Sequence, residues 1–129
     1  MLDTSTLILL DRLDADELPE ESTITAITLG ELSVGPLVTI DEHERARRLA
    51  HLQLAEADFE PLPYDATAAR VFGRIAAALR LAGRTSGARS FDVMIAATAI
   101  ANDLPLFTCN PRDFDGIDEL VVFAVTHPG

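Results

Sequence analysis

The sequence predicts an α/β protein of three layers, α/β/α, built around a central and mostly parallel sheet. Short β-branched or apolar runs alternate with longer helical patterns along the 129 residues, which is typical of βαβ units. Such units are right-handed and place helices on both faces of a parallel sheet. No repeat or long linker divides the chain. We therefore expect a single domain over residues 1–129.

The first half of the chain predicts short elements separated by polar connections. β-branched runs favour strands, whereas Pro and Gly end elements. The expected order is a very short strand at 1–3, a turn at Thr4 or Ser5, a helix to about Leu13, an acidic connection to Glu21, a strand at 22–25, a helix from about Thr28 to Gly35–Pro36, and a long helix beginning at Asp41.

The second half predicts two further helices and three strands. The expected order is a short strand at 59–62 closed by Pro63, a helix capped by Asp65 and running to Leu81, a flexible loop at 83–87, a helix from Ser90 to Asn102, and strands at 104–108 and 121–125. The helix at 90–102 is apolar on nearly every side, so we expect it to lie between layers, with Ser90 as its cap. The last strand is apolar throughout, as in an inner parallel strand.

Three carboxylates each stand alone in an otherwise uncharged stretch: Asp3 within 1–10, Glu31 within 22–40 and Asp92 within 90–102. Acidic side chains are rarely buried unless they are paired or bind a metal. Ligands bind beyond the carboxyl ends of parallel strands. We therefore expect these acids to meet at one edge of the sheet, together with a loop after the 104–108 strand that contains Asn110, Asp113 and Asp115.

A simpler interpretation exists for two of these acids. Asp3 is suited to cap a helix, and Asp92 to a first helical turn, where the helix dipole favours negative charge. Glu31 has no cation nearby in sequence to pair with it. Carboxylate oxygens without a His pair or a Cys cluster favour Mg²⁺ or Mn²⁺ over Zn²⁺. His43, His51 and His127 lack metal-ligand spacing and are expected at the surface.

Composition restricts the compartment and the partners. Cys109 is the only cysteine, which fits a reducing cytoplasm, and no apolar run approaches a membrane span. We expect a cytoplasmic protein without a membrane partner. A net charge of −11 argues against non-specific nucleic-acid binding. All ten basic residues are Arg, however, and Arg binds phosphate well. Arg45, Arg47 and Arg48 are expected to form a solvated helix face.

The joint pattern resembles the PIN-domain ribonucleases, and within them the VapC-type toxin of a VapBC toxin–antitoxin pair. The resemblance covers essentially the whole chain. It depends on Asp3-Thr-Ser after a strand, Glu31 on a short helix, Phe91-Asp92 opening an Ala-rich helix, and the segment from Thr108 to Phe114 after a strand. The segment Asp92-Val-Met-Ile-Ala-Ala-Thr-Ala is its most specific part.

The resemblance implies an Mg²⁺- or Mn²⁺-dependent endoribonuclease, with tRNA as the favoured substrate and products bearing a 5′-phosphate and a 3′-hydroxyl. Asp3, Glu31 and Asp92 match its catalytic and metal-binding positions. Asn110 stands where many relatives have Asp. We expect Asp113 to be the fourth acid, with Asp115 as the alternative. The surrounding residues are expected to orient ligands or water (Thr4, Ser5, Thr108, Asn110) or to contact RNA (Arg84, Arg89, Arg112).

The resemblance also implies a homodimer and a VapB-type antitoxin that covers an apolar groove. Spare apolar surface is expected at Leu7–Leu10 and on the 71–81 helix. Asn110 favours an alternative function, a catalytically impaired PIN-like module that binds RNA or protein. A receiver-like domain or phosphatase would require a second acid beside Asp3 and a Lys late in the chain, and neither is present.

Overall fold

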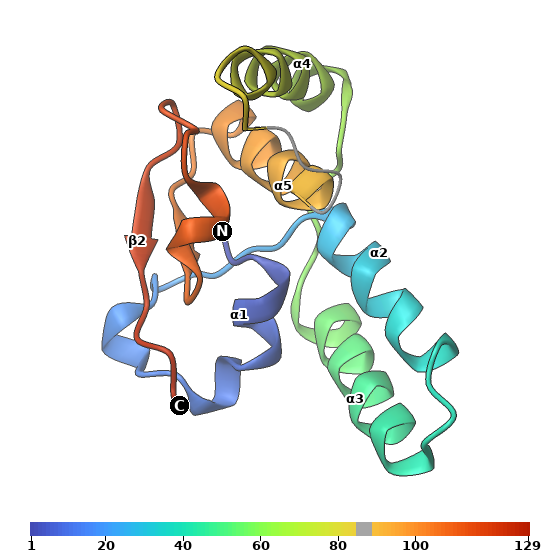
Figure 1. Cartoon of the computed structure of the whole chain (residues 1–129). Helices are drawn as coiled ribbons and strands as arrows, with labels where there is room; N and C mark the ends of the chain where they lie inside the picture. Colours follow the sequence, from blue (N-terminus) through green and yellow to red (C-terminus); the bar gives the residue numbers. More distant parts are fainter. Residues whose placement is uncertain (85–88) are drawn as a thin grey trace.

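The computed structural model describes residues 1–84 and 89–129. Within these residues, five α-helices pack around a small parallel sheet (Figure 1). Most of the predicted 83–87 loop lies outside the described residues. The α-helices are α1 (Thr4–Ile8), α2 (Ala26–Val34), α3 (Glu42–Asp58), α4 (Ala66–Leu81) and α5 (Ser90–Ala101), and the short 3₁₀ turns are η1 (Leu10–Arg12), η2 (Ala15–Glu17), η3 (Gly35–Leu37) and η5 (Pro111–Phe114).

The sheet is parallel, as predicted, but less regular than expected. Strands β1 (Leu106–Thr108) and β2 (Val122–Ala124) pair in parallel. Single parallel bridges join Leu2 to Phe107 and Thr25 to Leu62. A hydrogen bond of 2.9 Å from Leu2 N to Thr23 O connects the two parts.

The predicted strands at 22–25 and 59–62 are therefore reduced to one bridge. Leu62 lies between Pro61 and Pro63, and neither proline has an N–H to extend a ladder. Pro105 likewise precedes β1, which begins at Leu106 and not at 104. The prediction that 121–125 is an inner strand is wrong. Among the described residues β2 pairs only with β1, and Phe123 is 49% exposed.

Two separate cores show that helices cover both faces of the sheet. Met1 and Leu106 belong to one core, with α4, α5 and the segment 114–120. Their neighbours Leu2 and Phe107 belong to the other core, with α1, α2 and α3. Successive side chains of a strand point to opposite faces. Because Met1 and Leu106 face one helical layer and Leu2 and Phe107 face the other, the predicted three-layer order is confirmed.

Capping residues determine where most helices begin. Asp41 and Asp65 cap α3 and α4 through hydrogen bonds to Glu44 N and Ala68 N, as their sequence positions predict. Thr25 caps α2 through Thr28 N, so this helix begins at Ala26 and not near Thr28. A side-chain oxygen that accepts from the third helical residue satisfies an otherwise unpaired N–H.

The prediction that Ser90 caps α5 is wrong. Ser90 is the first residue of the helix, and its cap, Arg89, makes no side-chain capping bond. The helix at the start of the chain is also divided, because α1 ends at Ile8 and a separate 3₁₀ turn follows. Within the described ranges, no helix is both long and apolar enough to cross a membrane.

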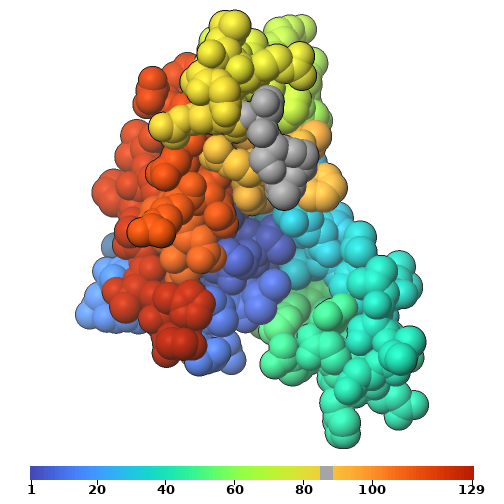
Figure 2. Space-filling model, in the orientation of Figure 1, coloured from blue at the N-terminus to red at the C-terminus, as the bar shows by residue number. Residues whose placement is uncertain are grey.

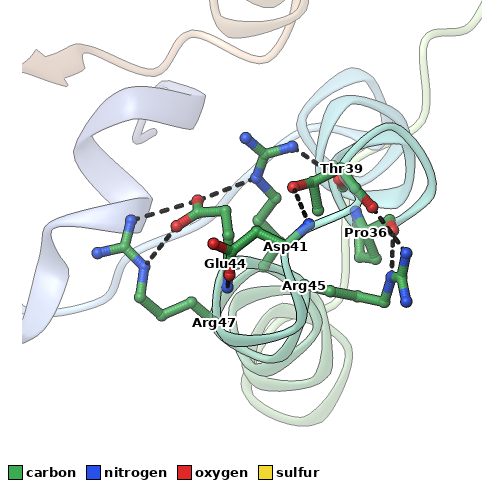
Figure 3. A network of polar contacts seen from close by, with 8 residues as sticks. Pro36, Thr39, Asp41, Glu44, Arg45 and Arg47 are labelled. Carbon is green, nitrogen blue, oxygen red and sulfur yellow. Dashed lines mark hydrogen bonds and ion pairs between the residues drawn. The ribbon is translucent and has the colours of Figure 1, made fainter.

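Helices α2 and α3 form a hairpin that projects from the rest of the molecule (Figure 1). Arginines at the start of α3 form hydrogen bonds that stabilise the connection between α2 and α3 (Figure 3). Arg45 donates to the carbonyls of Pro36 and Thr39, at 3.3 and 2.7 Å. Arg48 donates to Gly35 O and to Glu44 Oε1, and Arg47 also pairs with Glu44. Arg45 and Arg48 therefore stabilise the turn of the hairpin, whereas Arg47, which is 71% exposed and pairs within α3, is solvated as predicted.

Candidate functional site

Asp3 lies at the end of the first extended segment and caps α1. Its side chain is 2% exposed. The carboxylate accepts hydrogen bonds from Thr6 N at 3.3 Å, Ser5 Oγ at 3.2 Å and Thr108 Oγ1 at 2.9 Å. The expected capping role and the expected place at the sheet edge are therefore both met. Three of about four lone-pair positions on the carboxylate are in use, and the remaining one is on Oδ1.

Glu31 lies on α2, half-buried, and is oriented by α1. Thr4 Oγ1 donates to Glu31 Oε1 at 2.7 Å and lies 3.0 Å from Thr28 Oγ1. Among the described residues, Glu31 makes no ion pair. The sequence reasoning did not single out Thr28. Its position three residues before Glu31, on the same face of α2, is the signal that identifies it.

Asn110 connects β1 to the start of α1. Its side-chain Nδ2 donates to Ser5 Oγ at 2.9 Å, and its backbone N donates to Thr108 Oγ1 at 3.0 Å. Ser5 and Thr108 in turn donate to Asp3. A carboxylate could not donate to Ser5, so the amide has a use here that Asp would not have. Asn110 therefore supports the orientation of Asp3 through Ser5.

Asp92 lies in the first turn of α5 and experiences the charge of the other acids. Its pKa is raised from 3.8 to about 6, first by burial and then by the charges of Asp113, Glu31 and Asp3. The nearby Arg89 acts in the opposite direction. The other three predicted acids therefore lie within electrostatic range of Asp92. On the face shown in Figure 2, blue atoms of the first residues lie between cyan atoms of α2 and orange atoms of the segment near residue 110.

Asp113 is the more suitable fourth acid. It lies in η5 with an exposed side chain, and it contributes to the raised pKa of Asp92, whereas Asp115 does not. Asp115 follows η5 as its C-cap. Within residues 1–84 and 89–129, no three His, Cys, Asp or Glu side chains form a ready-made metal cluster. The four acids therefore do not converge closely enough to form a closed cation site.

The three arginines expected to contact RNA differ in their surroundings. Arg84 and Arg112 are exposed, and Arg84 lies beside Gly116, where an added Cβ would come within 3.0 Å of Arg84 Nη1. Arg89 is half-buried and donates to the backbone carbonyls of Asp113 and Asp115. Contact of these residues with RNA stays a prediction.

The expected apolar surface is found only in part: Ile8 (36% exposed) and Leu81 (89%) are exposed within the two predicted segments. Leu7 and the 71–79 part of α4 are buried in the two cores. Large apolar side chains are exposed mainly along the α2–α3 hairpin. We call this set the hairpin patch: Val34 (53% exposed), Leu37 (84%), Val38 (68%), Ile40 (97%), Leu49 (42%) and Leu54 (41%).

Comparison with known proteins identifies relatives of the whole chain. A family model described as PIN domain matches residues 1–120. The chain is 39% identical to Ribonuclease VapC5 of Mycobacterium tuberculosis, covering 92% of this chain and 87% of the relative. It is 33% identical to Ribonuclease VapC of Rickettsia bellii, covering 97% and 95%.

Solved structures agree with these relatives. The fold matches a chain in the crystal structure of VapBC-5 from M. tuberculosis, a member of the VapBC family of toxin-antitoxin systems, with a TM-score of 0.83, 37% identity and 96% coverage of both chains. It also matches a chain in the DNA-bound VapBC of Salmonella typhimurium, with a TM-score of 0.73 and 30% identity over 95% and 94% of the two chains.

Proposed function

Because this chain belongs to the PIN-domain family, as a VapC-type member, we propose that it is a metal-dependent endoribonuclease toxin. The observation that supports this proposal is that Asp92 lies close enough to Asp113, Glu31 and Asp3 for their charges, after burial, to raise its pKa to about 6. Asp3 also caps α1, but repulsion between Asp92 and three other acids costs stability, which helix capping alone does not require. A divalent cation offsets that repulsion and makes the arrangement useful.

The donor set fits Mg²⁺ or Mn²⁺. The candidate ligands are the carboxylates of Asp3, Glu31, Asp92 and Asp113, all of them hard oxygen donors. Mg²⁺ usually keeps several waters and takes only one or two carboxylates directly. The absence of a closed three-residue cluster among the described residues is therefore compatible with such a site. Bound there, the metal would lower the pKa of a water molecule and stabilise charge at a phosphate.

The chain's own residues orient the acids. Asp3 is held by three hydrogen bonds that leave a lone pair on Oδ1. Thr4 fixes Glu31 at 2.7 Å. Asp92 is partly protonated near pH 6 without metal and is expected to lose that proton when a cation binds. The hydrogen bonds therefore orient the Asp3 and Glu31 carboxylates before a cation binds.

The substrate is RNA, and the family resemblance favours tRNA cleaved to 5′-phosphate and 3′-hydroxyl ends. The relatives named Ribonuclease VapC support this class. A net charge of −11 excludes tight non-specific binding, so recognition must be local. Exposed Arg84 and Arg112 on two segments around the acids are suited to phosphate contacts. We expect the protein to act in the cytoplasm.

The partner is a VapB-type antitoxin that inhibits the toxin. The similar structures are VapBC complexes. The hairpin patch consists of exposed apolar side chains on a projecting element. Burying such a patch against a partner removes apolar surface from water, which favours binding there. We also propose a homodimer, in keeping with the family resemblance.

Isosteric replacement of three acids tests the proposal. Asp3→Asn, Glu31→Gln and Asp92→Asn each remove one charge with little change in volume, so each is expected to abolish Mg²⁺-dependent cleavage of folded tRNA while circular dichroism stays unchanged. Asp58→Asn, at the exposed end of α3, is the matched control and should cleave like wild type. A variant of the three that keeps wild-type activity would exclude its acid from the catalytic site.

The alternative function is a PIN-like binding module without catalysis. Asn110 in place of an acid favours it. The same cleavage assay separates the two functions, because a binding module would retain RNA in a shift assay yet leave it intact at every metal concentration.

A further inference from the structure

Arg89 links the two elements that carry the facing acids Asp92 and Asp113. It directly precedes α5, whose first turn holds Asp92. Its guanidinium reaches η5, where Nε donates to Asp113 O at 3.2 Å and Nη2 donates to the same carbonyl at 2.8 Å. Nη2 also donates to Asp115 O at 2.9 Å. One side chain thus binds two backbone carbonyls of the turn.

The Asp113 side chain depends on this anchoring because no core packing orients it. Asp113 is exposed, whereas its neighbour Phe114 is buried. Its backbone N–H donates to Asn110 O at 3.1 Å, which closes the turn but does not tie it to α5. Phe114 packs in the same core as α5, and among the described residues the three bonds from Arg89 are the hydrogen bonds that join the start of α5 to the backbone at 113–115. The planar guanidinium restricts the direction of each bond.

We propose that Arg89 is a positioning residue for the cation site, which holds the backbone of Asp113 so that its carboxylate and that of Asp92 serve the same divalent cation. This inference depends on the metal site of the proposed function. It gives Arg89 a role different from the RNA contact expected from its sequence position. Arg89 itself touches neither the cation nor the substrate.

The role makes Lys a poor substitute for Arg. Lysine keeps the positive charge near Asp92, but its single ammonium on a flexible stem cannot reproduce a rigid fork on two carbonyls. A purely electrostatic role would survive Arg89→Lys. A positioning role would not.

Calorimetric titration of Mn²⁺ into the full-length protein tests the proposal. We expect Arg89→Met and Arg89→Lys each to weaken Mn²⁺ binding by about tenfold, as loss of a group that supports a metal ligand does. Arg74→Met is the matched control, because Arg74 also forms a two-pronged interaction, with Glu119 at 2.8 Å for both bonds, away from the four acids. Its Mn²⁺ affinity should equal that of wild type.

A double-mutant cycle separates positioning from general damage to the fold. If Arg89 acts through Asp113, Arg89→Met should add little to the loss of Mn²⁺ affinity already caused by Asp113→Asn. Asp115→Asn should leave the affinity near that of wild type and the effect of Arg89→Met intact. Thermal melting in EDTA identifies any variant that fails to fold. If Arg89→Met is such a variant, Arg89→Lys decides.

Several results would overturn the proposal: wild-type affinity in Arg89→Lys, fully additive losses in the cycle, or no Mn²⁺ binding by wild type. The readout does not use RNA. A protein that binds Mn²⁺ in an Arg89-dependent way but cleaves no RNA would refute the proposed function and leave this inference standing.

Discussion

At the scale of single residues, the four acids differ in their burial, in the hydrogen bonds that orient them and in the effect of neighbouring charges. Asp3 is buried and accepts three hydrogen bonds. Glu31 is oriented by one hydroxyl, and Asp113 through its backbone. Burial, and then the charges of the other three acids, raise the pKa of Asp92 to about 6. Asp3 is held in one position by hydrogen bonds, whereas Asp92 can change its protonation state. This combination suits a site that must be stable both with and without a cation.

The raised pKa of Asp92 makes stability without metal dependent on pH. Asp92 has a higher pKa in the folded protein than its ordinary 3.8, so the folded state binds more protons between about pH 4 and 6. Ionisation of Asp92 destabilises the fold fully above about pH 6, and this penalty declines as the pH falls from about 6 to about 4. In EDTA, the melting temperature of wild type relative to Asp92→Asn should therefore rise between pH 7.5 and pH 5.

Saturating Mn²⁺ serves as the control for this comparison. Metal binding favours ionised Asp92, so it should remove the advantage of the lower pH. A constant difference in melting temperature between the two proteins across this pH range in EDTA would show that Asp92 titrates normally.

Thr108 should matter through its hydroxyl group. Thr108→Val removes the donor to Asp3 and the acceptor for Asn110 N at nearly constant volume. Thr108 is fully buried, so we expect a loss of about 1–3 kcal/mol in the free energy of unfolding, together with weaker cleavage. Thr108→Ser keeps the hydroxyl and should lose much less stability. Urea denaturation measures both, and equal losses would assign the effect to packing.

At the scale of secondary structure, local signals in the sequence predicted the helices better than the strands. Asp41 and Asp65 are caps whose effect is local, and both helices begin where these residues predict. The segments near Thr25 and Leu62 depend on partners far along the chain, and the prolines beside Leu62 limit them to one bridge. The edge position of β2 is decided by topology, which an apolar run does not reveal.

The candidate site was predictable to a similar extent. Lone acids in apolar stretches identified Asp3, Glu31 and Asp92, because the cost of burying charge is a local property. Two contacts of the site join residues far apart in the sequence. Asn110 donates to Ser5, which orients Asp3, and Arg89 donates to the backbone of η5. No spacing pattern predicts such contacts. The sequence already favoured Asp113 over Asp115, and the effect of Asp113 on the pKa of Asp92 supports that preference.

The hairpin patch should carry binding of the antitoxin. Leu37→Asp places a charge on a side chain that is 84% exposed, so the melting temperature should hardly change. Burying that charge against a partner is costly, and we expect affinity for the cognate antitoxin to fall by at least tenfold. Leu81→Asp, on a residue that is 89% exposed at the end of α4, is the control. Isothermal titration measures both, and equal affinities for wild type and Leu37→Asp would place the antitoxin elsewhere.

At the scale of the whole molecule, the fold brings four distant segments to one edge of a small parallel sheet. Residues 3–5, α2, α5 and η5 each supply one acid, and the two cores on either side hold these segments in place. The strongly acidic surface makes general affinity for RNA weak. We propose that activity depends on a cation bound at this edge.

Cleavage of folded tRNA by the purified protein, measured across a metal titration, tests this central claim most directly. We predict no cleavage in EDTA, recovery on addition of Mg²⁺ or of Mn²⁺ at lower concentration, and no recovery at any concentration for Asp92→Asn. Cleavage by wild type that is undiminished in EDTA would contradict the account.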